Sequence, residues 1–465
     1  MKKIFDYIQS NQKRFHDELA TLVRQPSNST TGEGIEGCAS VLQGLMRKSG
    51  IDTRILATNG SPVVYGETPK VEKGLTVLIY GHYDVKPPEP LGAWISAPYE
   101  PEIRNGRMYG RGTADNKGQM YAHIKAVESI LAVKQGLPIH VKFLFEGEEE
   151  IASPSLKAFV SENRSLLDAD LMYSSDGTMT FDRKPAVLFG VRGILKIEIS
   201  SRGGSRDTHS GIYGGLVPNP VWALVHLLKT MKGEDGRISI DGFYDDVLPP
   251  TPAEREALKR IAFDERAFCQ EHGLQALDKG PGDHPLERLM FWPTLNIQGF
   301  FAGTPEAEGI NVIPATARAI IDMRLVPNQK PEVVLQKVKA HVEEMRPLGD
   351  FTTVSKTQVP PFRSSLDHPY AAAVIDAVRR GFGEEPVLIP CMGWTDPTHL
   401  FGNLLGLPCF KVPYANPDSN FHAPNENLLL DVYDKSIKTT ATLLCRLARN
   451  ADANQKVSAY PPARF

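Results

Sequence analysis

The sequence has few cysteines, no excess of positive charge and no long apolar run. Its five cysteines are widely spaced without a CxxC pair, so we expect reduced, mostly buried thiols. The formal net charge of −3 makes nucleic acid an unexpected partner, and no apolar stretch approaches membrane-spanning length. The first fifteen residues lack the apolar core and cleavage site of a signal peptide and predict an amphipathic helix. We therefore expect a cytoplasmic enzyme that binds neither nucleic acid nor membranes.

The length of 465 residues exceeds that of one ordinary hydrophobic core, so two domains are expected. Strand and helix patterns alternate in the first part. Apolar runs at 75–80, 139–145 and 169–175 predict buried strands. A helical pattern follows Asp115 and ends near Gly136. This alternation predicts parallel strands joined by helices.

The sequence pattern changes after about residue 190. Residues 193–203 and 316–327 alternate apolar and polar side chains, as strands with one solvated face do. The region from about 231 to 292 is rich in charge, proline and glycine, and a surface helix is expected at 253–272. From about residue 370, patterns of a helix and then a buried strand return.

These changes predict an α/β fold with an inserted domain. We expect a discontinuous α/β domain of residues 1–190 and 371–465, interrupted by an α+β insert of residues 191–370.

Potential metal ligands follow the predicted strands. His82 and Asp84 come directly after the strand at 75–80, in the sequence GHYDV, and ligands bind at the carboxyl ends of parallel strands. His82 can offer a neutral ring nitrogen to zinc, while Asp84 can accept the other ring N–H. An HxD sequence alone equally fits a hydrogen-bonded turn.

Asp115 lies in GRGTADNKG, where three glycines precede the predicted helix. An aspartate at this place is typical of a helix N-cap, but an N-cap does not require the glycines. Glycines permit the close backbone approach that a buried ion site needs.

Acidic residues also follow the next two strands. Glu149 and Glu150 end the sequence EGEEE after the strand at 139–145. An acidic run is usually a solvated surface, but this one follows a mostly apolar strand. The two side chains are expected to point to different sides, so that one binds metal and the other faces a bound water. Asp176, in SSDG, equally fits an ordinary turn.

A histidine in the polar loop NFHAPNE completes the set. Alone it would be an ordinary loop residue. Together the sequence offers two histidines and three carboxylates as ligands: His82, Asp115, Glu150, Asp176 and His422. This mixture suits zinc, with manganese or cobalt as alternatives. Nearby Asp84 and Glu149 can move protons, so the set predicts a hydrolytic metal centre.

Seven sequence elements resemble those of a di-zinc metallopeptidase family that includes carnosine dipeptidases, acetylornithine deacetylase and succinyl-diaminopimelate desuccinylase. They are, in the family's order, GHYDV, GRGTADNKG, EGEEE, SSDG, DTHSG, DMRLVP and NFHAPNE, and they span about residues 75 to 430. The dipeptidase branch is the most similar, because deacylases more often have glutamate at the position of Asp176. The resemblance implies that residues 1–190 and 371–465 form the catalytic domain, with a phosphorylase/hydrolase-like mixed sheet. It also implies that residues 191–370 form an α+β lid that often dimerises, so a homodimer through the lid is expected.

The resemblance also implies how the ligands are shared between two zinc ions per subunit. Asp115 would bridge the ions. His82 and Asp176 would complete the shell of the first ion, and Glu150 and His422 that of the second.

The resemblance further implies roles for residues that do not bind metal. Asp84 would orient His82. Glu149 would be the general base, which takes a proton from the bridging water and gives it to the leaving amine. His209 would reach across the dimer to the scissile carbonyl oxygen. Arg324 would bind a substrate carboxylate, although an ion pair with Asp322 is an alternative.

Two positions depart from the dipeptidase pattern and concern specificity. Thr395, with Trp394 before it, lies in CMGWTDPTHLF, where the family has a glycine-rich substrate loop with smaller residues. Asn311 stands in GINVIP, where some dipeptidases have threonine. Both are candidate substrate contacts.

The sequence therefore predicts metal-dependent hydrolysis of an amide bond in dipeptides or short peptides. One alternative is an N-acyl-amino-acid deacylase that uses the same site on acyl-amino-acid substrates. Another is a catalytically silent relative that acts as a binding module, which the presence of Asp84 and Glu149 disfavours.

Overall fold

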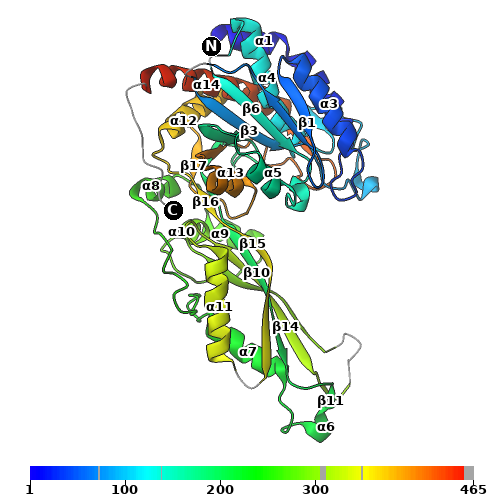
Figure 1. The fold of residues 1–465 in the computed structure, drawn as a ribbon, viewed down its shortest axis with the longest axis vertical. Coiled ribbons are helices and arrows are strands. Elements are labelled where there is room, and N and C mark those ends of the chain that lie inside the picture. The colour runs from blue at the N-terminus through cyan, green and yellow to red at the C-terminus, as the bar shows by residue number, and fades with distance from the viewer. Residues whose placement is uncertain (72–73, 138, 304–309, 347–348, 455–465) are drawn as a thin grey trace. The chain divides into compact units, whose positions relative to one another are not determined.

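The structure is a computed structural model that describes residues 1–71, 74–137, 139–303, 310–346 and 349–454. It divides into two compact units (Figure 1). Of the described residues, unit 1 comprises Met1–Phe189, Ser364–Ile389 and 396–454, and unit 2 comprises Gly190–Arg363 and Pro390–Thr395. The assignment of these units as a catalytic domain and a lid stays a prediction.

An eight-stranded mixed sheet forms the centre of unit 1. In spatial order its strands are β1 (Asp52–Leu56), β2 (Val63–Glu67), β6 (His140–Glu146), β3 (Thr76–His82), β7 (Leu171–Ser174), β18 (Cys409–Lys411), β8 (Ala186–Leu188) and β17 (Val387–Ile389). Strand β3 is parallel to both β6 and β7, as the apolar runs predicted. Strands β1 and β2 are antiparallel neighbours at one edge. The α/β class with a mixed sheet is confirmed.

Helices pack around this sheet. They are α1 (Lys2–Ser10), α2 (Gln12–Val23), α3 (Ile35–Lys48), α4 (Lys117–Lys134), α5 (Leu156–Glu162), α12 (Pro369–Phe382), α13 (Thr398–Leu405) and α14 (Leu430–Asn454). Phe143 of β6, Ile124 of α4, Val374 of α12 and Leu444 of α14 belong to one buried apolar core. Every residue of β6 is buried, as expected for a central strand covered on both faces.

A small sheet in unit 1 joins distant parts of the chain. Its order is β19 (Asn427–Leu429), β5 (Arg107–Tyr109) and β4 (Glu102–Arg104). Strand β19 pairs antiparallel with β5, with Asn427 opposite Tyr109. This pairing brings the loop that begins at Gly110 beside the loop that ends at Glu426.

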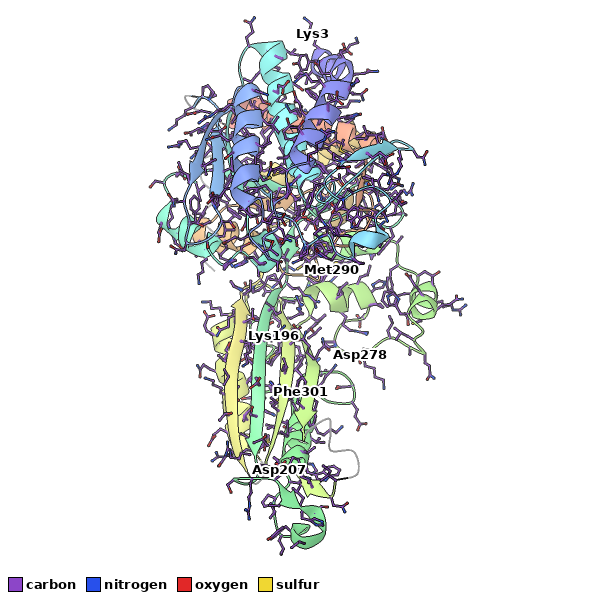
Figure 2. The ribbon with its side chains drawn as sticks, turned by 90° about the vertical axis from the view of Figure 1, so that its right-hand side faces the viewer. Lys3, Lys196, Asp207, Asp278, Met290 and Phe301 are labelled. Atoms are coloured by element: carbon purple, nitrogen blue, oxygen red, sulfur yellow. The ribbon has the colours of Figure 1, made fainter. Side chains whose placement is uncertain are left out.

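Unit 2 contains a four-stranded antiparallel sheet. Its order is β12 (Thr294–Ala302), β14 (Thr316–Leu325), β10 (Gly193–Arg202) and β15 (Asp350–Val359); Figure 2 labels Lys196 on β10 and Phe301 on β12. Burial alternates along β10, as its sequence predicted. Its inner side chains share a core with α7 (Pro220–Met231) and α11 (Pro331–Met345). A short pair, β11 (Thr208–His209) with β13 (Val312–Ile313), and α6 (Ser210–Tyr213) lie beyond the end of this sheet (Figure 1).

The single helix expected at 253–272 is wrong. The structure has two shorter helices there, α8 (Pro252–Lys259) and α9 (Glu265–Glu271). Asp264 ends the continuity, because its carboxylate accepts the backbone N–H groups of Arg266 and Ala267 and so starts a new helix.

Two exclusions made from composition can be compared with the structure. None of the helices within the described ranges is long and apolar enough to cross a membrane. The five cysteines are free thiols, and all but Cys269 are buried.

Candidate metal centre

Three neighbouring strands bring the first potential ligands together at the carboxyl ends of the strands. His82 is the last residue of β3 and lies opposite Glu146, the last residue of β6. On the other side of β3, Tyr80 lies opposite Ser174, two residues before Asp176. The acidic pair Glu149 and Glu150 follows β6 in a short 3-10 turn. Parallel strand ends therefore place His82, both glutamates and Asp176 together.

The remaining ligands arrive through the β5–β19 pair. Gly110, directly after β5, donates its backbone N–H to the carbonyl of Glu426 at 3.0 Å. Asp115 follows in the first loop and His422 precedes in the second. Asp115 does not cap α4, whose N-cap residue is Asn116 without a side-chain cap hydrogen bond. The N-cap alternative for Asp115 is therefore excluded by the structure.

Two groups of three potential ligands share Asp115. We call His82, Asp115 and Asp176 the first position, and Asp115, Glu150 and His422 the second position. Asp115 Oδ1 lies 3.2 Å from His82 Nε2, whereas its Oδ2 lies 2.9 Å from His422 Nε2. His422 Nε2 is also 3.1 Å from Glu150 Oε2. The two oxygens of one carboxylate thus face the two positions separately.

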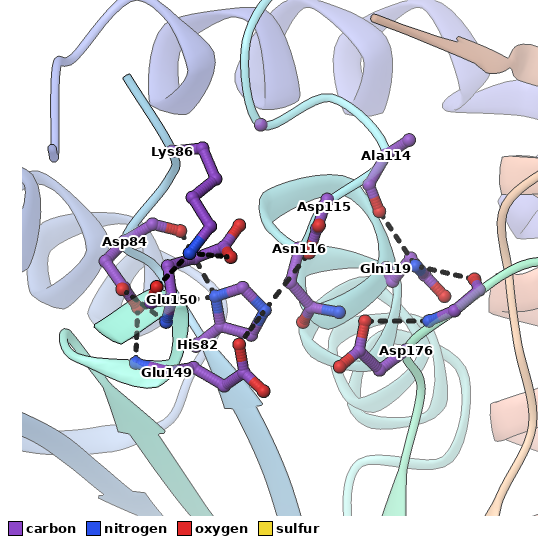
Figure 3. Close-up of polar contacts among 12 residues, drawn as sticks. His82, Asp84, Lys86, Ala114, Asp115, Asn116, Gln119, Glu149, Glu150 and Asp176 are labelled. Carbon is purple, nitrogen blue, oxygen red and sulfur yellow. Dashed lines mark hydrogen bonds and ion pairs between the residues drawn. The ribbon is translucent and has the colours of Figure 1, made fainter. Parts of the chain in front are cut away.

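Asp84 supports both the imidazole and the acidic turn (Figure 3). His82 Nδ1 lies 3.1 Å from the Asp84 carbonyl oxygen and 3.3 Å from its Oδ1. The Asp84 carboxylate also accepts the backbone N–H groups of Glu149 and Glu150, at 3.2 and 3.1 Å. One buried aspartate therefore orients the His82 ring and fixes the turn that carries the two glutamates.

Glu149 points into the same centre but belongs to neither ligand group (Figure 3). Its Oε2 is 4.0 Å from His82 Nε2, and its side chain is 19% exposed against 4% for Glu150. The two glutamates thus take different places, as the sequence predicted.

The electrostatics of the centre favour bound cations. Burial raises the pKa of Glu149, Glu150 and Asp176, and the neighbouring carboxylates raise it further. Burial also acts on Asp115, but hydrogen bonds with His422 and His82 hold its pKa below the usual range. The same bonds with Asp115 and Glu150 raise the pKa of His422 to about 10. Without a metal ion, Glu149, Glu150, Asp176 and His422 therefore bind protons more readily than usual, and a cation in the centre would relieve the same repulsion among the carboxylates.

Two buried atoms fit a metal ion directly. Glu150 Oε1 makes no hydrogen bond within the described part of the chain, and His82 Nε2 has none beyond its 3.2 Å contact with Asp115 Oδ1. Buried polar atoms are almost always partnered, and an ion at the first position would serve His82 Nε2 and one at the second position Glu150 Oε1. Two imidazole nitrogens and three carboxylates suit zinc, manganese or cobalt.

The sequence reasoning missed Glu426, although the residue lies in the NFHAPNE element. Its fully buried carboxylate accepts hydrogen bonds from Arg111 Nη1 and from the backbone N–H groups of Gly112, Ala114 and Asp115, all at 2.9 Å. Glu426 therefore fixes the loop of Asp115 against the loop of His422. The only indication of this role in the sequence was that Glu426 lies next to a strand and has no other assigned function.

Gln119 and Lys411 were also missed. Gln119 donates to the carbonyls of Ala114 and Gly177, at 2.8 and 3.1 Å, and so ties the residues beside Asp115 and Asp176 together. Buried Lys411 pairs with Asp396 and lies 3.9 Å from Asp176 Oδ2. A lysine within the apolar run LPCFKV signals a buried carboxylate partner.

The four predicted substrate contacts lie in unit 2 as two pairs. Arg324 Nη1 donates to Thr395 Oγ1 at 3.3 Å, and Arg324 Nε lies 3.2 Å from Asp322 Oδ1. The Asp322 ion pair considered as an alternative is therefore present. His209 is adjacent to Ser210, whose N–H donates to the Asn311 carbonyl at 2.8 Å.

Comparison with known proteins agrees with this geometry. The sequence profile of peptidase family M20/M25/M40 matches residues 78–448. The chain belongs to this family. The predicted enzyme class, a metallopeptidase, is thereby confirmed.

Similar members of the M20 family include dipeptidases. The human Beta-Ala-His dipeptidase is 28% identical over 97% of this chain and 93% of its own length. The Cys-Gly metallodipeptidase of Schizosaccharomyces pombe is 29% identical over 83% of each chain. These relatives support the resemblance to the dipeptidase branch.

Solved M20 structures share the fold. The metallo-carboxypeptidase Sso-CP2 from Sulfolobus solfataricus has a TM-score of 0.82 and 34% identity, covering 94% of this chain and 99% of that one. Human carnosine dipeptidase 1 has a TM-score of 0.74 and 26% identity, covering 96% and 98%.

The role of Glu426 generates a prediction. In Glu426→Gln an amide NH₂ replaces one carboxylate oxygen. Because the NH₂ cannot accept hydrogen bonds from the backbone N–H groups that it faces, the loop of Asp115 should shift. Bound metal per subunit should fall, and kcat/KM should drop about tenfold or more, as expected when buried donors lose their acceptor. Metal analysis and steady-state kinetics check this result.

The matched control is Glu128→Gln. Glu128 is a partly buried carboxylate that pairs with Arg14 and Lys125 away from both loops. This control should lower thermal stability without changing metal content. Wild-type metal content and kcat in Glu426→Gln would contradict the assigned role.

Proposed function

We propose that this M20 peptidase hydrolyses the amide bond of dipeptides, or the terminal bond of short peptides, with two metal ions per subunit. The observation that carries the proposal is the sharing of Asp115 between two ligand groups. The dipeptidase and carboxypeptidase names of the similar proteins support a small substrate with a free carboxylate.

His82, Asp115 and Asp176 would hold the first ion, and Asp115, Glu150 and His422 the second. Zinc suits this donor set, with manganese or cobalt as alternatives. Such ions lower the pKa of a water molecule and polarise the scissile carbonyl. Asp84 would keep the His82 ring in the orientation that presents Nε2, since the Asp84 carbonyl and carboxylate both face Nδ1.

Glu149 would be the general base and then the general acid. Its carboxylate lies beside the first position without being one of the ligands. Because burial raises its pKa, the group can hold a proton taken from water until the leaving amine accepts it.

Arg324 and Thr395 would bind the substrate carboxylate, whereas Asn311, which lies beside His209, would contact a substrate in the partner subunit. The support is a guanidinium held by Thr395 and Asp322 with part of its side chain, 29%, still exposed. A planar guanidinium binds a carboxylate through two parallel hydrogen bonds.

His209 would act on the active site of a partner subunit, in a homodimer formed through unit 2. Within unit 2, Arg324 lies opposite Ile194, whereas Thr316, at the other end of β14, lies opposite Arg202. The eight residue steps between Thr316 and Arg324 span about 26 Å, and β11 with His209 lies beyond the Thr316 end (Figure 1). One dipeptide cannot reach both His209 and Arg324 of the same subunit.

A substrate panel tests the proposed reaction. Dipeptides, their C-terminal amides and N-acyl-amino acids would be assayed with zinc, manganese and cobalt. Cleavage of free dipeptides with weak cleavage of the amides supports the proposal. Release of acyl groups with intact dipeptides would instead identify a deacylase, and no cleavage of any member would favour a silent relative.

The cytoplasmic location stays a prediction.

Separate substitutions distinguish the base from a ligand. Glu149→Ala should lower kcat by about 10²-fold to 10⁴-fold, the usual contribution of general acid–base catalysis, with bound metal nearly unchanged. His422→Ala should lose metal and activity together. Wild-type turnover in Glu149→Ala would show that another group is the base.

Complementation tests the role of His209 across the dimer. Glu149→Ala and His209→Ala subunits should each be inactive alone. Their heterodimer contains one site with both groups intact, so an equal mixture should recover about a quarter of wild-type activity after statistical exchange of subunits in a twofold dimer.

The control mixture combines Glu149→Ala with His422→Ala. Both changes fall in the centre of the subunit that carries them, so no intact site forms. Absence of recovery in the first mixture, despite proven subunit exchange, would refute the action of His209 on its partner.

A further inference from the structure

Lys86 contacts one of the proposed metal ligands directly. Its ammonium nitrogen lies 3.3 Å from Glu150 Oε2 and also donates a close hydrogen bond to the Glu150 carbonyl (Figure 3). Glu150 Oε2 is the same oxygen that lies 3.1 Å from His422 Nε2. A cation belonging to the chain therefore occupies the neighbourhood of the second position.

The backbone around Lys86 places its side chain there. The N–H of Val85 donates to the Ser27 carbonyl at 2.9 Å, and Pro87 follows, which restricts Lys86 to an extended conformation. The Pro87 carbonyl in turn accepts Arg111 Nη2 at 3.2 Å. With both flanking residues held, Lys86 starts from a fixed point next to the acidic turn.

Lys86 differs from Lys411 in the kind of carboxylate with which it pairs. Lys411 is buried and pairs with Asp396, which is not a ligand, while Asp176 Oδ2 is 3.9 Å away. The Lys411 charge is thus balanced by its own carboxylate. Lys86 instead pairs with Glu150, which is itself a proposed ligand. The ammonium and a metal ion at the second position would therefore interact with the same negative charge.

We propose that Lys86 competes with the metal ion at the second position and weakens its binding relative to the first. This inference rests on the two-metal function proposed above. An ion held by Glu150 and His422 either displaces the ammonium from Oε2 or is repelled by it at short range. The Lys86 side chain is 32% exposed, so its head group can turn toward water on a flexible stem. The second ion then exchanges more readily than the first.

Calorimetric titration of the metal-stripped, full-length protein with Mn²⁺ tests this proposal, with bound manganese counted by elemental analysis. Lys86→Met removes the charge but keeps an unbranched side chain. It should tighten the weaker of two binding steps by about twofold to fivefold, the upper part of the range for a partly exposed ion pair, and leave the tighter step unchanged. Lys86→Arg keeps the charge and should stay near the wild-type constants.

Lys435→Met is the matched control. Lys435 forms a partly exposed ion pair with Asp431 at 2.7 Å on α14, so the substitution removes the same charge from unit 1 without touching a ligand. It should leave both constants unchanged.

The failures of the two proposals are distinguishable. Two binding steps in the wild type, with an unchanged or weaker second step in Lys86→Met, would overturn the competition alone. A single ion per subunit at saturating Mn²⁺, in the wild type and in Lys86→Met, would overturn the two-metal function and the competition together.

Discussion

Repulsion among buried carboxylates is the constraint on which the arrangement of unit 1 depends. Four acids meet in and beside the two ligand groups, and burial raises the pKa of three of them. The neighbouring acids Asp84 and Glu426 accept hydrogen bonds from other groups of the chain. Asp84 accepts two backbone N–H groups, and Glu426 accepts three together with Arg111. The chain thus gives Asp84 and Glu426 hydrogen-bond donors of their own, whereas the charge of the proposed ligands would be balanced by metal ions.

Much of this centre could be predicted because strand ends are visible in the sequence. The apolar runs before His82, Glu149 and Asp176 are buried neighbouring strands, so the residues after them share one edge. The supports could not be predicted in the same way. Glu426 bonds to residues more than three hundred positions earlier, and only the pairing of β5 with β19 brings them together. The position of Lys86 depends equally on a backbone contact with Ser27.

In unit 2, too, the strands could be predicted from the sequence but their contacts could not. Alternating side chains identified β10 and β14, because a strand with one buried face repeats every two residues. Their register, which puts Arg324 opposite Ile194 and Thr316 opposite Arg202, cannot be predicted from either strand alone. The break between α8 and α9 depends on Asp264 using its carboxylate as a cap, whereas helical periodicity alone continues through that residue.

The division of Asp115 between two histidines has a thermodynamic consequence. Because one carboxylate faces His82 through one oxygen and His422 through the other, an ion at either proposed position would change the charge that the other position experiences. Such coupling is reciprocal: whatever factor the first ion applies to the affinity of the second, the second applies to the first. The two positions would therefore be coupled, and the affinity of each would be defined only for a stated occupancy of the other.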